Sequence, residues 1–186
     1  MKYLWAPWRI QYFKGPTRKD CIFCSLPGEG RDREHRIVYQ GQRMFAILNT
    51  FPYNSGHLMV VPRRHVADLG ALEDAEILEW IHLTTAAMEA IRDAYGSEGF
   101  NVGANFGRAA GAGIADHLHL HVVPRWVGDT NFMPVAGEVK VLPEDLSVTH
   151  DRIAAALRAV LARRTPAGGS TAGRATSDRK ADRSVE

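Results

Sequence analysis

Histidines and aliphatic residues alternate strictly in one short segment, which runs His117-Leu-His119-Leu-His121-Val-Val. Successive side chains of a β-strand point to opposite faces of a sheet. The alternation therefore predicts a half-buried strand with three imidazoles on one face and the aliphatic side chains in the core. Imidazole is both a metal ligand and a nucleophile, so this face predicts a functional site. The alternative is a polar strand face that is merely rich in histidine.

Other segments predict further strands. Residues 37–48 alternate around Gln40-Gly41-Gln42, which predicts a hairpin. Residues 57–62 predict a strand that follows a turn, and residues 99–106 and 117–124 predict two strands joined by a loop.

Two segments show helical spacing. Residues 73–95 predict one long helix, and Gly96 supplies a stop. The apolar face predicted for it contains Ile77, Ile81, Thr84, Met88, Ile91 and Tyr95. Residues 145–164 predict a shorter C-terminal helix with an apolar side through Ile153, Leu157 and Leu161. Strands joined by short turns and packed with these helices predict an α+β fold with an antiparallel sheet.

Composition changes this picture only at the C-terminus. The chain has 186 residues, of which 45% are hydrophobic, and this fits one globular domain over residues 1–164. Residues 165–186 are mostly Gly, Ser, Ala and charged residues, with Val185 the one strongly apolar side chain. Such a segment cannot bury enough apolar surface to offset the entropy lost on ordering, so we expect a disordered tail.

Charge and hydropathy restrict the partners that we expect. The formal net charge is only +2, which gives no argument for a nucleic-acid partner. No apolar run approaches the roughly 18 to 20 residues that a membrane helix needs. Residues 1–9 lack the apolar core of a signal peptide. We therefore expect a cytoplasmic protein without a membrane partner.

Both cysteines lie in the segment Cys21-Ile-Phe-Cys24, which predicts either a redox pair or half of a zinc site. The segment precedes the first predicted hairpin and is not part of a βαβ unit, which favours a metal. A closed structural zinc site needs four ligands, so two histidines must come from elsewhere in the chain. Free structural thiols are the alternative.

The histidine run has the form His-φ-His-φ-His-φ-φ, where φ is hydrophobic, and on this basis the chain resembles the histidine triad (HIT) nucleotide hydrolases and transferases. The resemblance extends from Leu4 to Val141, through the cysteine segment and residues 48–62. Within the family the chain resembles the bacterial group that acts on diadenosine tetraphosphate as phosphorylases or hydrolases. That group shares the opening Leu-Trp-Ala-Pro-Trp-Arg and the Val-Val-Pro-Arg-Trp that follows the triad.

The resemblance implies covalent catalysis at a phosphoanhydride bond. His119 matches the family's nucleophile, whose imidazole attacks the α-phosphorus and forms a nucleotidyl-histidine intermediate. His121 lies on the same predicted face, from which it can donate a hydrogen bond to phosphate oxygens as charge develops. His57 matches a fourth histidine that orients the nucleophile from a neighbouring strand.

A glycine-rich loop over residues 107–116 precedes the triad, and its backbone N–H groups can approach phosphate oxygens closely. The alternative is a flexible connector, with Arg108 a solvated cation. The resemblance assigns Asn105 to the α-phosphate and Asn49 to the ribose, while Trp126 can stack on a base or pack at the pocket rim. The predicted nucleotide-binding residues are Asn49, Asn105, Gly107, Arg108, Gly113, His119, His121 and Trp126.

The resemblance also completes the metal site and implies an assembly. In cysteine-bearing HIT proteins the remaining two ligands match His65 and His117, so we expect a structural zinc on Cys21, Cys24, His65 and His117. HIT proteins pair their sheets in dimers, which implies a homodimer here.

One position departs from the family pattern. Some HIT proteins carry Ser or Thr three residues before the first triad histidine, where the hydroxyl helps the leaving group, and Ile114 occupies that position here. A polyphosphate leaves without such help, whereas an amine needs a proton. We therefore expect cleavage of dinucleoside polyphosphates such as diadenosine tetraphosphate, with orthophosphate as acceptor. The alternatives are an asymmetric hydrolase that uses water, a nucleoside phosphoramidase, and a nucleotide-binding protein without turnover.

Overall fold

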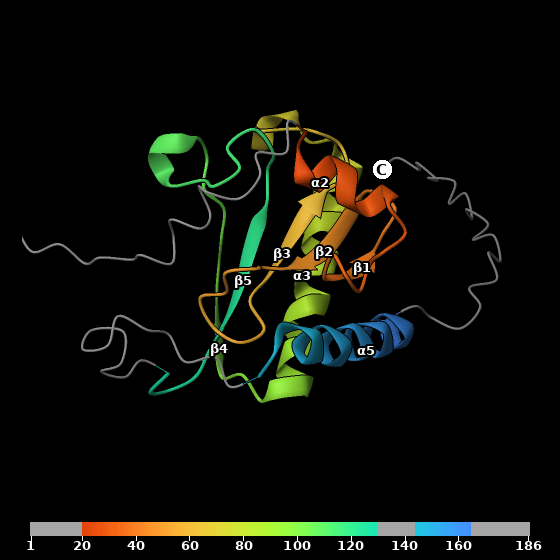
Figure 1. Cartoon of the computed structure of the whole chain (residues 1–186), viewed down its shortest axis with the longest axis vertical. Coiled ribbons are helices and arrows are strands. Elements are labelled where there is room, and N and C mark those ends of the chain that lie inside the picture. Colours follow the sequence, from red (N-terminus) through yellow and green to blue (C-terminus); the bar gives the residue numbers. More distant parts are fainter. Residues whose placement is uncertain (1–19, 130–143, 165–186) are drawn as a thin grey trace, which may run out of the picture.

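Five antiparallel strands form one sheet with the order β1-β2-β3-β5-β4 in the part of the chain that the structure describes (Figure 1). The structure is a computed structural model, and it describes residues 20–129 and 144–164. The strands are β1 (Ile37–Gln40), β2 (Met44–Leu48), β3 (Leu58–Pro62), β4 (Gly99–Gly103) and β5 (Leu120–Arg125). The predicted α+β fold and antiparallel sheet are confirmed. The predicted tail over residues 165–186 lies outside the described residues.

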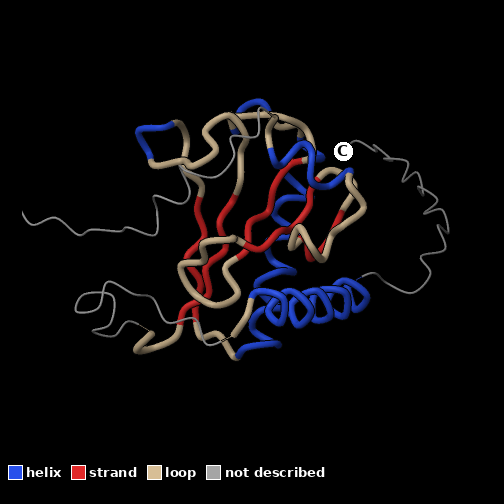
Figure 2. The backbone as a smooth tube through the Cα atoms, viewed as in Figure 1, coloured by secondary structure: helices blue, strands red, loops and turns tan. Residues whose placement is uncertain are grey.

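Two long helices and several short helical turns accompany the sheet. These are α2 (Ile22–Ser25), η1 (Leu26–Gly28), η2 (Leu69–Ala71), α3 (Asp74–Tyr95), η3 (Arg108–Ala110) and α5 (Leu146–Arg164). Figure 2 shows the long connection, with η3 at its tip, that joins β4 to β5. No described helix is both long and apolar enough to cross a membrane.

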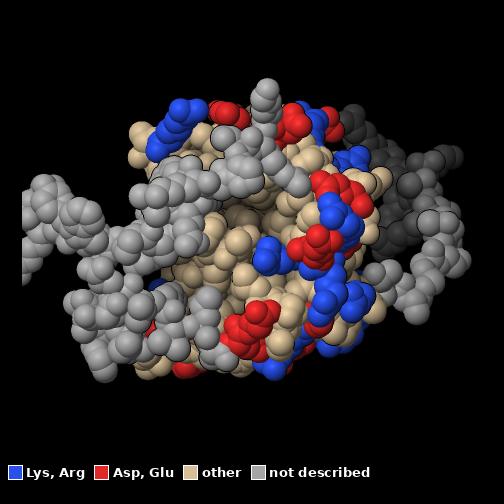
Figure 3. Space-filling view, in the orientation of Figure 1, with Lys and Arg blue, Asp and Glu red and all other residues tan. Residues whose placement is uncertain are grey.

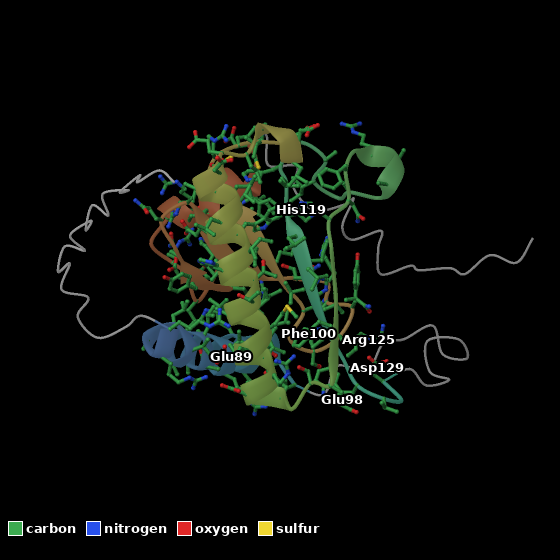
Figure 4. All side chains as sticks on the ribbon, turned by 180° about the vertical axis from the view of Figure 1, so that it is seen from behind. Glu89, Glu98, Phe100, His119, Arg125 and Asp129 are labelled. Carbon is green, nitrogen blue, oxygen red and sulfur yellow. The ribbon has the colours of Figure 1, made fainter. Side chains whose placement is uncertain are left out.

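Alternating side chains divide the sheet into two packed faces. On β2, Met44 and Ala46 pack in the cluster that α3 and α5 complete, while Phe45 and Ile47 point to the opposite face. Phe23 of α2 packs with them there. Helix α3 lies behind the sheet in Figure 1 and in front of it in Figure 4. The opposite face, toward the viewer in Figure 1, is the one that carries the histidines.

The bounds predicted for the long helix are confirmed, but its predicted apolar face is partly wrong. Glu73 and Glu76 form a capping box at the start of α3, and Gly96 ends it in the left-handed conformation. Ile77 and Ile81 are 39% and 51% exposed. The buried positions at this end are occupied by Trp80 and, further along, by small alanines, which let the helix approach the sheet closely.

The shorter C-terminal helix was predicted correctly. Its residues Ile153 and Leu157 are fully buried against α3 and the sheet, and Leu161 is half-buried.

The strand predicted over residues 117–124 begins later than expected, at Leu120. Val60 pairs with Leu120 as the last pair between β3 and β5, and Pro62, which has no N–H to donate, ends β3. The N–H of Leu118 instead donates to the carbonyl of Val66 at 2.6 Å. His117 and His119 therefore precede the strand. Leu118 is still buried, so the alternation continues outside regular strand structure.

Candidate active site and metal cluster

Hydrogen bonds at His57 and His121 fix which ring nitrogens carry protons. The backbone N–H of Tyr53 donates to Nδ1 of His57 at 3.0 Å, so Nδ1 is an acceptor and the neutral ring carries its proton on Nε2. That Nε2–H faces Nδ1 of His121 at 2.9 Å. Nδ1 of His121 accepts this bond, so the neutral His121 ring carries its own proton on Nε2.

His119 is oriented by the backbone of its own segment. Its Nδ1–H donates to the carbonyl oxygen of His117 at 2.8 Å, which leaves the lone pair on Nε2. The rings of His119 and His121 lie with centroids 5.0 Å apart. Burial lowers the pKa of His119, and burial together with His119 lowers the pKa of His121 to about 4. Both rings are therefore neutral at neutral pH, as a nucleophile and a neutral hydrogen-bond donor require.

His117 has the opposite arrangement. Its Nε2–H donates to the carbonyl oxygen of Pro62 at 2.8 Å, so the lone pair is on Nδ1. That nitrogen lies 3.3 Å from Sγ of Cys21 and 3.5 Å from Sγ of Cys24. Nδ1 of His65 lies 3.2 Å from Sγ of Cys24. The four predicted ligands therefore converge, with their donor atoms within 4.8 Å of one another.

The donor set fits a tetrahedral metal ion. Zinc bonds of about 2.3 Å to sulfur and about 2.05 Å to nitrogen place S and N about 3.5 Å apart across a tetrahedral edge. The observed S to N distances of 3.2 to 3.5 Å are close to this value. Burial and the neighbouring Cys21 raise the pKa of Cys24 to about 11, and a bound cation would favour its thiolate. The cluster could therefore bind a metal.

A cleft of about 450 Å³ extends from His121 along β4 and β5. Tyr53 and His121 line it, together with Gly103, Asn105, Arg125 and Asp129. Figure 3 shows that the sheet face opposite α3 is hollowed, with a basic group beside the hollow. The volume lies in the range of small-molecule sites, which are about 300 to 1,000 Å³.

The residues predicted to bind nucleotide are spread over a wider area than this cleft. Asn105 lines it. Asn49 lies outside it, where its side chain accepts a hydrogen bond from the N–H of Phe51 at 2.9 Å. Gly107, Arg108 and Gly113 are exposed in the connection between β4 and β5. Contact of any of these residues with nucleotide stays a prediction.

Trp126, the last predicted nucleotide-binding residue, lies away from the histidines. Its indole N–H donates to the carbonyl oxygen of Tyr95, at the end of α3, at 3.3 Å. The side chain is half-buried and does not line the cleft. This position favours packing at the rim, one of the two roles that the sequence left open.

Comparison with known proteins identifies the family. The family described as HIT domain matches residues 31–127. The chain belongs to the histidine triad (HIT) family. It is similar to a protein of Mycobacterium tuberculosis named AP-4-A phosphorylase, with 40% identity over 162 residues that cover 83% of each chain. An uncharacterized HIT-like protein of Methanocaldococcus jannaschii is 32% identical over 64% of this chain and 89% of its own length. The chain is thus a HIT-family enzyme, as predicted.

A solved HIT structure supports the fold and is relevant to the metal cluster. The zinc-bound histidine triad family protein from Mycobacterium smegmatis aligns with a TM-score of 0.63 and 25% identity. The alignment covers 77% of this chain and 97% of that protein.

Sequence reasoning missed several residues that shape the HIT site. The ring of Tyr53 lies 4.6 Å from that of His57 and stacks on His121 at 5.9 Å. The ring of Phe23 lies 5.4 Å from that of His119, although the sequence analysis predicted no role for Phe23. The signal available for Tyr53 was its position four residues before His57, in the loop that enters β3.

Proposed function

We propose that this HIT enzyme cleaves dinucleoside polyphosphates such as diadenosine tetraphosphate through a nucleotidyl group carried on His119. The observation that supports this most strongly is the hydrogen bond from Nδ1–H of His119 to the His117 carbonyl, because it leaves the Nε2 lone pair for attack. The relative named AP-4-A phosphorylase supports the choice of substrate.

The first step forms a bond between Nε2 of His119 and the α-phosphorus and breaks the bond from that phosphorus to the bridging oxygen. The leaving group of diadenosine tetraphosphate is adenosine triphosphate, which takes the bonding electrons with its oxygen. Nε2–H of His121 donates a hydrogen bond to a phosphate oxygen as negative charge grows. His57 donates from Nε2 to Nδ1 of His121, and this hydrogen bond keeps the Nε2–H donor of His121 in place.

The second step transfers the adenylyl group from His119 to an acceptor. With orthophosphate the product is adenosine diphosphate, and with water it is adenosine monophosphate. We favour orthophosphate because of the 40% identity with AP-4-A phosphorylase. A phosphoramidase is the weaker alternative, since Ile114 packs on the apolar cluster around Phe23 and supplies no hydroxyl for an amine leaving group.

Product analysis tests this proposal. Purified enzyme is incubated with diadenosine tetraphosphate, with and without orthophosphate, and the adenosine mono-, di- and triphosphates are resolved. Di- and triphosphate that form only with phosphate are expected. Monophosphate and triphosphate without phosphate would establish the asymmetric hydrolase, and binding without any turnover would overturn the enzymatic proposal.

The metal cluster supports a second part of the proposal, a structural zinc on Cys21, Cys24, His65 and His117. When bound, the ion would tie α2 to the segments at the ends of β3 and β5 and would take no part in phosphoryl chemistry. Metal analysis should find about one zinc per chain. Less than about half an equivalent, with no change on chelation, would contradict it.

We also propose a homodimer. Strand β4 is an edge of the sheet, and Asn101, Val102 and Gly103 on it are exposed. Such an edge is open to pairing with a second sheet. Light scattering that gives the mass of one chain at micromolar concentration would contradict it. A cytoplasmic location and the absence of a nucleic-acid partner stay predictions.

A further inference from the structure

The cleft has two ends with different chemistry. His121 and Arg125 both point into it from β5, and four residues of a strand span about 13 Å. On the neighbouring strand, Gly103 lies opposite His121 and Asn101 lies opposite Val123. Figure 4 shows Arg125 and Asp129 at the opposite end of β5 from His119. A ligand that reacts at the histidines can therefore extend along β5 to Arg125.

Four polar residues form this distal end, which we define as Asn54, Asn101, Arg125 and Asp129. Nε and Nη2 of Arg125 donate to the Asp129 carboxylate at 2.6 and 2.8 Å. Nη1 of Arg125 donates to Oδ1 of Asn101 at 2.7 Å, and Nδ2 of Asn54 donates to Asp129 at 2.8 Å. These bonds hold the four side chains in one arrangement before any ligand arrives.

The distal end carries no net charge. Arg125 and Asp129 neutralise each other in a bidentate pair, and they are the charged side chains among the described residues that line the cleft. A phosphate group held at this end would therefore meet no uncompensated positive charge. Carboxylate and amide oxygens accept hydrogen bonds and amide and guanidinium groups donate them, and Val123 supplies apolar wall. This chemistry suits a neutral ligand with hydroxyls and a flat ring.

The direction of the displacement indicates which part of the substrate would lie at the distal end. In an in-line displacement the leaving group departs on the side of phosphorus away from the nucleophile. His121 lines the cleft, whereas His119, the nucleophile, is 5% exposed and does not. A leaving group that departs past His121 would therefore enter the cleft.

We propose that Asn54, Asn101, Arg125 and Asp129 form a subsite for the nucleoside of the leaving group, which is the second nucleoside of a dinucleoside polyphosphate. This inference rests on the proposed function. The polyphosphate would cross the cleft between the two ends, with its charge balanced by solvent and counterions, and the ribose hydroxyls or base of the second nucleoside would meet the polar side chains.

Binding to a protein that cannot turn over tests the subsite separately from the reaction. In a His119→Ala background, the Kd of diadenosine tetraphosphate is compared with that of adenosine 5′-tetraphosphate, which has the same phosphates but only one nucleoside. We expect the dinucleotide to bind about tenfold more tightly, as one or two added hydrogen bonds would give. Equal Kd values would overturn the proposal.

Two further substitutions locate the preference. Asn101→Ala removes a side chain that lines the cleft and leaves the backbone of the edge strand in place, so it should reduce this preference severalfold by weakening the binding of the dinucleotide alone. Asp129→Asn leaves Arg125 unpaired, so it should weaken the dinucleotide while the mononucleotide binds as well or better. Asp151→Asn breaks a comparable ion pair with Arg33, outside the cleft, and should change neither Kd.

If Asn101→Ala and Asp129→Asn weaken the binding of both nucleotides equally, the distal end holds phosphate or only supports the fold. That result would overturn the proposed subsite. Cleavage by the wild-type enzyme is measured independently. If the preference is present but the wild type cleaves no dinucleotide, the subsite stands and the proposed function fails. If the wild type cleaves the dinucleotide but the His119→Ala protein shows no such preference in binding, the proposed function stands and the subsite fails.

Discussion

His117 and His119 are two residues apart, yet their rings have opposite arrangements. His117 donates from Nε2 to Pro62 and directs Nδ1 to two cysteines. His119 donates from Nδ1 to the His117 backbone and leaves Nε2 for chemistry. The carbonyl that each ring meets therefore decides which nitrogen is available, and equal spacing in the sequence does not imply equal roles.

Phe23 lies between these two regions. It stands between Cys21 and Cys24 in the chain and is 1% exposed. Its ring centroid lies 5.4 Å from those of both His117 and His119. The metal cluster and the proposed nucleophile thus share one buried contact, although they use different atoms.

Replacement of the proposed nucleophile should have the largest effect. His119→Ala should lower kcat for diadenosine tetraphosphate by about a thousandfold or more, because the covalent step is lost. Nucleotide binding and metal content should stay as in the wild type, since the metal ligands are intact. Initial rates, calorimetry and metal analysis check the three quantities.

His117→Ala is the matched variant two residues away. It should lose the metal, because it removes one of four ligands. If His119→Ala lost the metal as well, or if His117→Ala kept it, the separation of the two roles would be wrong.

Removal of the proposed structural metal should have the second largest effect, which we expect to be a loss of stability. A bound ion at a thousand times its Kd stabilises the fold by about 4 kcal/mol. For a domain of this size that corresponds to a fall in Tm of about 10 °C on chelation. Cys24→Ser should show the lowered Tm without chelator. A Tm unchanged by chelation in wild type, measured by calorimetry, would contradict a structural metal.

The sequence predicted the framework and the identity of the clusters well, for a physical reason. The continuous apolar runs of β2 and β3 and the glycine after α3, Gly96, are local signals, and local signals predict elements. The cysteine and histidine ligands were found by family resemblance, because nothing in the spacing shows that His65 approaches Cys24.

The structural features that could not be predicted from the sequence depend on contacts between distant segments. The late start of β5 follows from the bond between Leu118 and Val66, and the exposure of Ile77 follows from Trp80 facing the sheet. The cleft is likewise a product of the fold. Asn54 and Asp129 are 75 residues apart in the chain, and no local pattern links them.

A change at Phe23 should have a smaller effect and shows whether the two regions are coupled. Phe23→Leu removes the ring that contacts both histidines and leaves all four metal ligands in place. We expect a loss of stability of about 1 to 2 kcal/mol from the smaller side chain. The kcat should fall about tenfold, since a nucleophile displaced by a fraction of an ångström reacts more slowly.

Metal content separates coupling from simple damage in this variant. It should remain at the wild-type value while kcat falls. Phe45→Leu is the control, because Phe45 packs on Phe23 in the same cluster with ring centroids 6.3 Å apart. Equal losses of kcat in both variants would mean that only general packing is involved.

The smallest expected effect concerns His121 and pH. The pKa of a histidine in an unfolded chain is about 6.5, and burial lowers the pKa of His121 to about 4 in the folded protein. Between these values the unfolded chain binds a proton that the folded chain does not, so stability is lost as pH falls from 6.5 to 4.

His121→Asn removes the titrating group, and the Oδ1 of the new side chain can still accept the bond from His57. The stability lost between pH 7 and pH 5.5, measured by urea unfolding, should therefore be smaller by about 1 kcal/mol in this variant. His82→Asn, at an exposed position of α3, should leave the loss unchanged. If His121→Asn also left it unchanged, His121 would titrate normally and would not be the neutral donor on which the proposed reaction depends.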